Sequence, residues 1–477
     1  MTYHASTSVL LGFLVATVIG APSSINNHPV PAALSPIAPT QVSSSTTPIS
    51  FDLIREARDI SSSRLLRRTV DDTDIQVYNF SSVSYNIALS IGTPGQTVRV
   101  IIDTGSSELW VNPNCGRAQS YTQQQQCLNS GYYDMNESST SKTSALQSQI
   151  QYGIGAVTIR YVSDSIALPG SDIVVDDIIF GNAMDSHDMN QGILGLSFGQ
   201  GYNLNYPTFI DQLVLQNITN IHGFSLALGT KTDPGGGVLT FGGVDTKKFA
   251  GKLHTEPIIP PANPGELHRY WIQMSSVGVT TDEQHETFPD SSALVFFDSG
   301  ATLSYLPTNV VTKLAKSLDA TFDRARGLYE TSCDSSGTVD FTFGNYTVNV
   351  PVSEFLWDMG VGNCYLGVEA SNSTYLLGDS FLRSVYAVFD MDTPAIHFAS
   401  YVNCGSNPQM IPPGANRARE FKGQCDPMLH LTRKTTHIAR SESSGGSGRN
   451  IDSSADRPIQ SALMAAVVAF GALSLML

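Results

Sequence analysis

Short runs of β-branched and aromatic residues recur along most of this chain, and glycine, proline, asparagine or aspartate separates each run from the next. Runs of this kind between turn residues are typical of β-strands. The runs that show the pattern are 77–80, 83–91, 98–102, 156–161, 173–180, 238–241, 339–343, 346–350 and 385–389. Helical patterns are few, and the best are 208–216 and 307–318. The pattern therefore predicts an all-β chain built from sandwich-like or barrel-like lobes.

The N-terminal residues carry a pattern typical of targeting and processing. An apolar run over 9–18, followed by small residues, indicates a secretory signal peptide over 1–20 that is too short to span a membrane. A stretch rich in Pro, Ser, Thr and Ala then leads to Arg67 and Arg68. We expect residues 21–68 to be a pro-segment that is released at this dibasic pair, and the alternative is a pair of solvated surface charges.

The C-terminal residues form a second targeting pattern. Residues 462–477 are apolar and uncharged, and a stretch rich in Ser and Gly over 441–448 precedes them. Small residues, a polar spacer and a terminal apolar tail predict a GPI-attachment signal over 455–477 that is removed on maturation. Asn450 or Ser453 is the expected attachment residue, and a short tail-anchored helix is the alternative. The sequence thus predicts a secreted protein held at the cell surface by a lipid anchor.

Composition narrows the classes of function further. The formal net charge is −15, with 42 acidic residues against 27 lysines and arginines. This balance argues against a nucleic-acid-binding protein, which would show an excess of basic residues. An acidic surface instead favours solubility at low pH and attracts cationic substrates.

Six cysteines in a secreted chain suggest three disulfides, for which fifteen pairings are possible. Sequence proximity favours the pairs Cys115–Cys127, Cys333–Cys364 and Cys404–Cys425. We expect no metal site, because neither a C-x-x-C motif nor paired histidines at zinc spacing occur. Five glycosylation sequons agree with secretion, at Asn79, Asn136, Asn217, Asn345 and Asn372.

The candidate catalytic residues lie in a short motif that occurs twice in the chain. Asp103-Thr104-Gly105 and Asp298-Ser299-Gly300 each end an apolar run, and the two aspartates are 195 residues apart. Each copy is followed by an apolar-apolar-Gly sequence, at Gly195 and at Gly378. Two such turns facing each other would place two carboxylates side by side. Like charges at that distance do not both ionise easily, so the pair would hold one proton and could act as acid and base in amide hydrolysis by water.

These residues resemble the pepsin-like aspartic endopeptidases, and the resemblance covers residues from about 80 to 402. The motifs in family order are Ile91-Gly92-Thr93-Pro94, Asp103-Thr104-Gly105-Ser106-Ser107-Glu108-Leu109-Trp110-Val111, Tyr152-Gly153-Ile154-Gly155, Ile193-Leu194-Gly195, Phe241-Gly242-Gly243, Asp298-Ser299-Gly300 and Leu377-Gly378-Asp379-Ser380-Phe381-Leu382-Arg383. Taken with the two ends of the chain, the sequence is most similar to the fungal yapsin-type members that are GPI-anchored at the cell surface.

The resemblance implies a bilobal fold of two β-barrel-like lobes with an active-site cleft between them. The expected lobes are 69–255 and 256–403, followed by a Ser/Gly-rich stalk over 404–454. It also implies that Asp103 and Asp298 are catalytic, that polypeptides are the substrates, and that no cofactor is required. We expect a monomer. The residues expected to form the flap and bind substrate are Gly105, Ser106, Trp110, Tyr152, Gly153, Gly155, Ile193 and Gly300.

Two departures from the family pattern bear on chemistry. Ala301 stands where many relatives carry a hydroxyl beside the second aspartate, and the loss of this donor should raise the pKa of the dyad. Ile159 stands where the flap usually has glycine, with Arg160 after it. The stretch 185–188 contains two aspartates that could favour basic side chains in the substrate, and a solvated acidic loop is the equally weighted alternative.

Two other classes of function compete with the endopeptidase. A catalytically silent pepsin-like binding or inhibitor protein would normally have lost an aspartate or the flap tyrosine, and this chain retains all three. A structural cell-wall glycoprotein would show repeats or a low-complexity core, and the core has neither. The sequence does not identify the physiological substrate, the pH optimum or the order of maturation.

Overall fold

The computed structural model describes residues 48–57, 83–112, 115–118, 120–153, 155–168, 171–187, 189, 191–233, 237–263, 265–282, 284–358 and 363–426. All of them belong to one unit, Met1–His430. The expected signal peptide, the pair Arg67-Arg68, the sequon Asn79 and the attachment signal with Asn450 and Ser453 lie outside the described residues.

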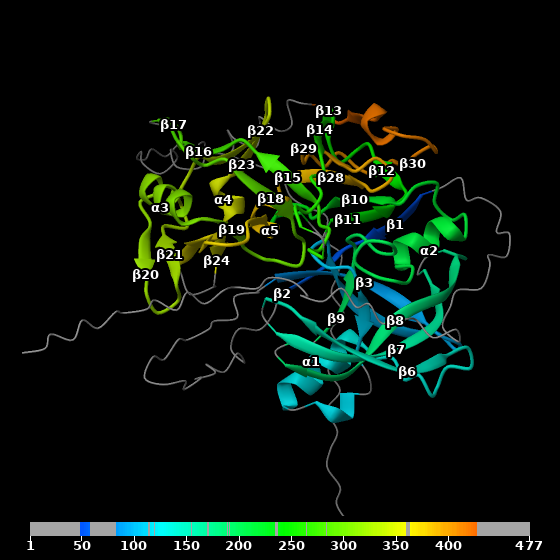
Figure 1. The fold of residues 1–477 in the computed structure, drawn as a ribbon. Coiled ribbons are helices and arrows are strands. Elements are labelled where there is room, and N and C mark those ends of the chain that lie inside the picture. The colour runs from blue at the N-terminus through cyan, green and yellow to red at the C-terminus, as the bar shows by residue number, and fades with distance from the viewer. Residues whose placement is uncertain are drawn as a thin grey trace, which may run out of the picture. The chain divides into compact units, whose positions relative to one another are not determined.

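The first half of the chain folds into an eight-stranded sheet (Figure 1). Its strands, in spatial order, are β2 (Ile54–Ala57), β3 (Val83–Ile91), β4 (Gln96–Asp103), β9 (Gly192–Gly195), β5 (Leu109–Val111), β8 (Val174–His187), β7 (Ala156–Ala167) and β6 (Lys142–Gln151). An additional pairing between β3 and β7 curls the sheet back on itself, as in a barrel. The helical elements η3 (Cys115–Arg117), α1 (Tyr121–Ser130) and α2 (Phe209–Leu215) belong to this half.

The second half is built from three smaller sheets. The five-stranded sheet is ordered β15 (Trp271–Met274), β18 (Ala293–Phe297), β27 (Leu376–Leu377), β19 (Ser304–Pro307) and β26 (Val368–Ser371). One four-stranded sheet is β17 (His285–Thr287), β16 (Ser276–Thr280), β22 (Thr338–Phe343) and β23 (Tyr346–Pro351), and the other is β20 (Thr321–Asp323), β21 (Leu328–Thr331), β25 (Cys364–Leu366) and β24 (Leu356–Asp358). The helices here are α3 (Thr308–Ser317), α4 (Val352–Phe355) and α5 (Asp379–Leu382).

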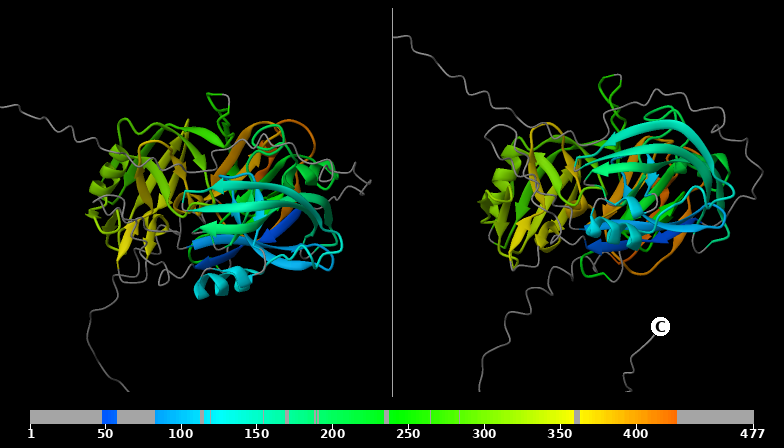
Figure 2. Two further views of the ribbon diagram at one scale, coloured as in Figure 1. Left: turned by 60° about the horizontal axis from the view of Figure 1, so that its bottom comes forward. Right: turned by 90° about the horizontal axis from the view of Figure 1, so that it is seen from below.

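A six-stranded antiparallel sheet joins the two halves. Its order is β1 (Ile49–Asp52), β11 (Val238–Phe241), β10 (Gly223–Ala227), β28 (Val385–Asp390), β29 (Ala395–Ser400) and β14 (His254–Pro257). Phe224 of β10 lies directly opposite Phe389 of β28 in this sheet, and the two rings stack with centroids 4.6 Å apart, so a strand from each half contributes to the same aromatic packing. Figure 2 shows the cyan strands of the first half and the yellow strands of the second as separate sets.

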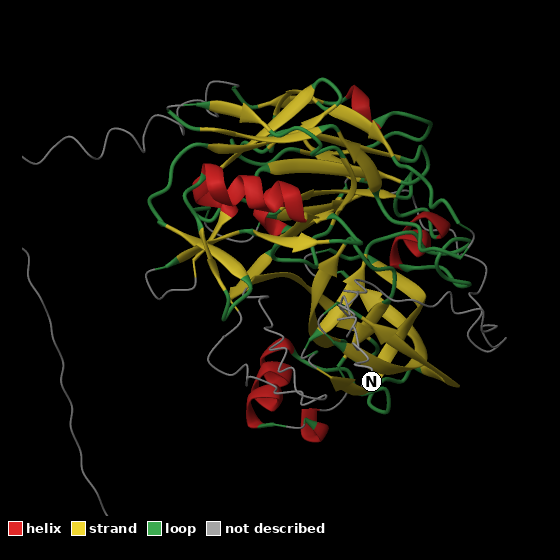
Figure 3. Cartoon of the chain, turned by 60° about the vertical axis from the view of Figure 1, so that its left-hand side comes forward, coloured by secondary structure: helices red, strands yellow, loops and turns green. Residues whose placement is uncertain are grey.

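The all-β prediction is confirmed, and the helices of the described residues are few and short beside the strands (Figure 3). The expected strand 83–91 is β3, and the runs 238–241 and 346–350 lie in β11 and β23. The expected helices 208–216 and 307–318 are α2 and α3. Helix α1 was not predicted, because its sequence YTQQQQCLNS has no apolar period and its start depends on the Ser120 side chain, which accepts a hydrogen bond from the Gln123 backbone N–H.

Part of the expected pro-segment pairs with strands of the fold in the uncleaved chain. Residues 48–57, which lie inside the expected pro-segment, form β1 and β2 and pair with β11 and β3. Isoleucine and phenylalanine side chains of β1 are buried there, so this part of the segment packs against the rest of the uncleaved chain.

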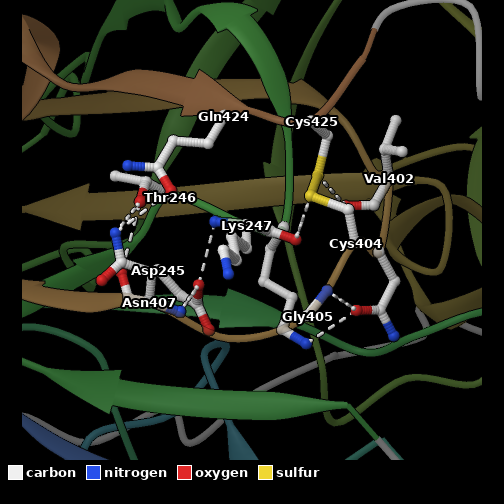
Figure 4. The surroundings of a disulfide bond; sticks show 11 residues. Asp245, Thr246, Lys247, Val402, Cys404, Gly405, Asn407, Gln424 and Cys425 are labelled. Atoms are coloured by element: carbon white, nitrogen blue, oxygen red, sulfur yellow. Dashed lines mark hydrogen bonds between the residues drawn. A yellow bond between two sulfur atoms is a disulfide. The ribbon is translucent and has the colours of Figure 1, made fainter.

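The expected stalk does not begin at residue 404. β30 (Pro408–Met410) pairs with β12 (Gly243–Asp245), and β31 (Lys422–Gln424) pairs with β13 (Ala250–Lys252), with η4 (Ala418–Glu420) between them. Ile411 and Ala418 are buried in this layer. The disulfide Cys404–Cys425 closes the segment, and both cysteines contact the Lys247 carbonyl (Figure 4).

Candidate active site

The two Asp-Thr/Ser-Gly turns have the same local construction. β4 ends at Asp103 and runs parallel to β9, whereas β18 ends one residue before Asp298 and runs parallel to β27. A glycine of the neighbouring apolar-Gly motif lies against each turn. A Cβ added at Gly195 would lie 2.4 Å from the Ser107 carbonyl carbon, and one at Gly378 would lie 2.4 Å from the Ala301 carbonyl oxygen. The repeated apolar-Gly sequence is therefore needed because each aspartate turn passes directly over it.

Two hydroxyls tie the turns to each other. The Thr104 hydroxyl donates to the Phe297 carbonyl at 2.8 Å and accepts from the Ser299 N–H at 3.0 Å. The Ser299 hydroxyl donates to the Ile102 carbonyl at 2.9 Å and accepts from the Thr104 N–H at 3.2 Å. These four bonds are buried and join residues almost two hundred positions apart, so they set the relative position of the two aspartates.

Glycine in each turn allows the carboxylates to approach one another. The Gly105 N–H donates to Asp103 Oδ1 at 2.8 Å, and the Gly300 N–H donates to Asp298 Oδ1 at 2.9 Å. A Cβ on Gly105 would lie 2.7 Å from Asp298 Oδ2, and a Cβ on Gly300 would lie 2.6 Å from Asp103 Oδ1. Each carboxylate thus packs against the glycine of the opposite turn, at a distance that only glycine permits.

The environment of the pair favours a shared proton. Burial, and then the negative charge of Asp103, raises the pKa of Asp298 to about 8. Burial also raises the pKa of Asp103, but this carboxylate has two donors of its own, the Ser106 hydroxyl and the Gly105 N–H, which oppose the rise. Asp103 is therefore the better placed of the two to carry the negative charge, and Asp298 the better placed to hold the proton.

The predicted flap reaches the turn of the first aspartate through Tyr152, whose hydroxyl interacts with the Ser106 side chain. Tyr152 follows β6 and is 8% exposed, and its N–H donates to the Gly155 carbonyl at 2.7 Å, which closes a tight turn at the tip. The fully buried Trp110 donates its indole N–H to the Tyr152 hydroxyl at 2.9 Å. Ile193 of β9 is buried in the same apolar cluster, whereas Gly153 is exposed.

The unusual Ile159 is accommodated by a glycine on the neighbouring strand. Ile159 is fully buried on β7, and a Cβ at Gly181 of β8 would lie 2.6 Å from its Cδ1 atom and 2.9 Å from its Cβ. The side chain therefore occupies space that any other residue at position 181 would take. Arg160 lies on the same strand and is partly exposed.

Comparison with known proteins identifies the family. The model of the eukaryotic aspartyl protease family matches residues 84–401, which is most of the chain. The chain belongs to the eukaryotic aspartyl protease family. Yapsin-3, an aspartic proteinase of Saccharomyces cerevisiae, is 32% identical over 66% of this chain and 65% of its own length. A probable aspartic-type endopeptidase opsB of Aspergillus fumigatus is 32% identical over 70% and 72%, and secreted aspartic protease 8 of Candida albicans is 33% identical over 66% and 75%.

Two residues of this protease were missed by the sequence analysis, because neither belongs to a motif. Arg269 precedes β15, and its charge acts on both Asp103 and Asp298. Glu369 on β26 lies opposite Tyr305 of β19, and burial raises the pKa of its carboxyl to about 7. No signal in the sequence distinguishes Arg269 or Glu369 from the other charged residues of the chain.

The remaining predicted residues of the protease are placed as follows. The structure contains the disulfides Cys115–Cys127, Cys333–Cys364 and Cys404–Cys425, the pairs that sequence proximity favours. Asp358 lies close to the second of these, but both sulfurs there are disulfide-bonded and not free to bind a metal.

The four sequon asparagines within the described residues, Asn136, Asn217, Asn345 and Asn372, are all exposed. Within the described part of the chain, no helix has the length and apolar character needed to cross a membrane.

Proposed function

We propose that Asp103 and Asp298 are the catalytic dyad of this aspartic endopeptidase. The observation that carries the proposal is the close packing of the two carboxylates, because each of them lies against the glycine of the opposite turn. The Tyr152 hydroxyl of the expected flap is held by Trp110. The two acids differ in their donors, and general acid–base catalysis by a pair of carboxyl groups needs one ionised and one protonated member.

The reaction follows from this difference. The Asp103 carboxylate takes a proton from a water molecule as the water oxygen attacks the scissile carbonyl carbon, and Asp298 gives its proton to the carbonyl oxygen. Asp103 then delivers its proton to the amide nitrogen as the C–N bond breaks, and Asp298 regains a proton from the hydroxyl group as the new carboxylic acid forms. Tyr152, held by Trp110, closes the cleft above the dyad and excludes bulk water from the charged intermediates.

We further propose that the protease cleaves preferentially those substrates that carry a lysine or arginine a few residues away from the cleaved bond. Residues directly opposite each other in a sheet point to the same face. Phe296 lies opposite Leu376, Leu376 opposite Tyr305, and Tyr305 opposite Glu369. The charge of Asp298 acts on Tyr305, which places the second aspartate beside this row of residues.

Glu369 is therefore on the cleft-facing side of the five-stranded sheet. Three strand spacings of ~4.8 Å place it about 14 Å from Phe296, and side chains on one face of an extended peptide repeat every ~7 Å. Glu369 would then meet a substrate side chain about two positions along one face from the scissile bond. A second acid, Asp185, is exposed on β8 opposite Thr158, beside the flap. Both groups favour cationic substrates.

The preference should depend on pH. The pKa of Glu369 is raised to about 7 by burial, so its carboxyl is mostly neutral at pH 5 and increasingly ionised as the pH rises. Only the ionised form attracts a lysine or arginine side chain. We expect the ratio of kcat/KM for a lysine-containing peptide to that of its norleucine analogue to grow about five- to tenfold from pH 5 to pH 8.

Substitution at Glu369 tests this specificity. Glu369→Gln should abolish the growth of the ratio, whereas Glu286→Gln, an exposed acid on β17, should leave it intact. A pH-dependent preference that persists in Glu369→Gln would reject the assignment of this residue.

We propose that the protease is secreted, is processed at Arg67-Arg68, and is lipid-anchored at the cell surface as a monomer. The supporting observations are the apolar sequences at both ends of the chain, three disulfides, and exposed sequon asparagines. Release of the full-length protein from expressing cells by a phosphatidylinositol-specific phospholipase would support the anchor. Retention after that treatment would favour a tail-anchored helix instead.

The proposed chemistry is tested with the full-length protein produced through a eukaryotic secretory pathway. Peptide cleavage should occur between pH 3 and 7, be blocked by a statine-type inhibitor, and be lost in Asp103→Asn and Asp298→Asn. Correctly processed, folded protein that cleaves no peptide at any pH would refute the proposal and favour the silent binding protein. Activity that survives either substitution would refute the dyad.

A further inference from the structure

Arg269 is held between the two halves of the catalytic centre. The next residue, Tyr270, is fully buried, and its hydroxyl donates to the Leu196 carbonyl at 2.5 Å, which anchors the backbone at the start of β15. From there, Arg269 Nε donates to the Gly105 carbonyl at 3.4 Å. The guanidinium carbon lies 5.0 Å from the centroid of the Phe296 ring. One side chain thus contacts the turn of the first aspartate and the strand that leads to the second.

The charge of Arg269 acts on both carboxylates. It lowers the pKa of Asp103 and that of Asp298 against the larger effect of burial. Burial lowers the pKa of the guanidinium itself, and the two aspartates counteract this change. An arginine in such a place stays protonated across the acidic range, so its positive charge is constant while the dyad titrates.

The two aspartates have unequal side-chain support. Ser106, three residues after Asp103, donates its hydroxyl to that carboxylate. The equivalent position after Asp298 is Ala301, which has no donor. The Gly300 N–H is the donor that Asp298 has from its own turn, and Arg269 is the cation that acts on this carboxylate.

Few other charged or titratable groups face the dyad within the described residues. Tyr152 approaches from the flap and Tyr305 from β19, and burial raises the pKa of both, so they are neutral throughout the working range. Glu369 acts on Tyr305, and Glu108 acts on Tyr152. Among these groups, Arg269 is the cation that acts on both aspartates.

We propose that Arg269 is a positioning residue of the dyad, whose fixed positive charge replaces the hydroxyl that Ala301 lacks and keeps one carboxylate ionised in acid. This inference rests on the proposed function of Asp103 and Asp298. It revises the expectation drawn from Ala301 alone, because the missing hydrogen bond is offset by a charge supplied from another strand. The Arg269 charge and a hydroxyl at position 301 should therefore have the same effect on the alkaline limb of the pH profile, which reports the ionisation of Asp298.

The test compares pH profiles of kcat/KM for four variants of the full-length secreted protein. Arg269→Gln should move both limbs upward, the acidic limb by about one pH unit, because an opposite charge at close range lowers a carboxyl pKa by 1 to 3 and Arg269 acts on both aspartates. Arg269→Lys keeps the charge and should leave both limbs near their original positions. Adding Ala301→Thr to Arg269→Gln should lower the alkaline limb again, since the new hydroxyl donor stabilises ionised Asp298. Arg326→Gln is the control, an arginine whose guanidinium lies 5.6 Å from the Tyr365 ring centroid and pairs with Asp323.

The outcomes separate this inference from the proposed function. An inactive parent would reject the function, whereas an active parent whose acidic limb is unmoved in Arg269→Gln would reject only the role of Arg269. A change in KM alone, without a shift of either limb, would make Arg269 a substrate-binding residue and also overturn the inference. If Arg269→Gln does not fold, Arg269→Lys decides, because a shift of a full pH unit in a variant that keeps the charge contradicts an electrostatic role.

Discussion

The hydroxyl of Thr104 offers the sharpest test of how the two halves position the dyad. Thr104→Val keeps the shape of the side chain but removes the hydroxyl that donates to the Phe297 carbonyl and accepts from the Ser299 N–H. Thr104 is fully buried, so water cannot replace either bond. Each buried polar group left without a partner costs about 1 to 3 kcal/mol, which predicts a loss of about 2 to 5 kcal/mol in the free energy of unfolding.

The same change should reduce activity, because these bonds set the relative position of the aspartates. A displacement of about 1 Å in a catalytic group lowers the rate by roughly a hundredfold. The assays are denaturant unfolding followed by tryptophan fluorescence and kcat/KM at the pH optimum. Thr219→Val is the matched control, since this buried threonine donates one hydroxyl bond, to the Ile221 carbonyl at 3.2 Å. It should cost about 1 kcal/mol and leave kcat unchanged.

A double-mutant cycle completes this prediction. Ser299→Ala removes the reciprocal bonds to the Ile102 carbonyl and the Thr104 N–H. Because the two residues belong to one network, the effects of Thr104→Val and Ser299→Ala should not add, and we expect a coupling energy of about 1 to 3 kcal/mol. Additive effects, or a Thr104→Val variant as stable and active as the parent, would refute the reasoning that these hydroxyls join the two turns.

Two further predictions concern packing and the C-terminal segment. Gly181→Ala should destabilise the flap half by about 1 to 3 kcal/mol, because the new methyl group meets Ile159. Adding Ile159→Val, which removes the Cδ1 atom nearest to position 181, should recover part of this loss in the thermal midpoint; a Gly181→Ala variant as stable as the parent would show that the strands can separate. Replacing Cys404 and Cys425 together by serine should lower the free energy of unfolding by about 3 kcal/mol, given a sequence separation of 21 residues, and should expose the segment to limited proteolysis; resistance to protease equal to that of the parent would contradict a stabilising role for this disulfide.

Several features of the protein follow from the sequence because they depend on neighbouring residues. Alternating β-branched runs predicted β3, β11 and β23, since a strand's side chains repeat every two residues whatever the strand pairs with. The repeated Asp-Thr/Ser-Gly motif predicted the two aspartate-bearing turns, because each turn needs a glycine and a hydroxyl residue at fixed positions beside its aspartate. The disulfide pairs were favoured by short separations along the chain.

Other features were decided only by contacts between residues far apart in the sequence. Residues 48–57 have the composition of a released segment, yet they complete two sheets because β11 and β3 present free edges to them. Arg269 and Glu369 belong to no motif, and their neighbours are Gly105 on one side and Tyr305 on the other. Local sequence determines which segments become strands and turns, whereas the charge that reaches a buried carboxylate depends on which distant strand packs beside it. The sequence therefore indicated the two acids, and only the tertiary structure revealed the cation between them.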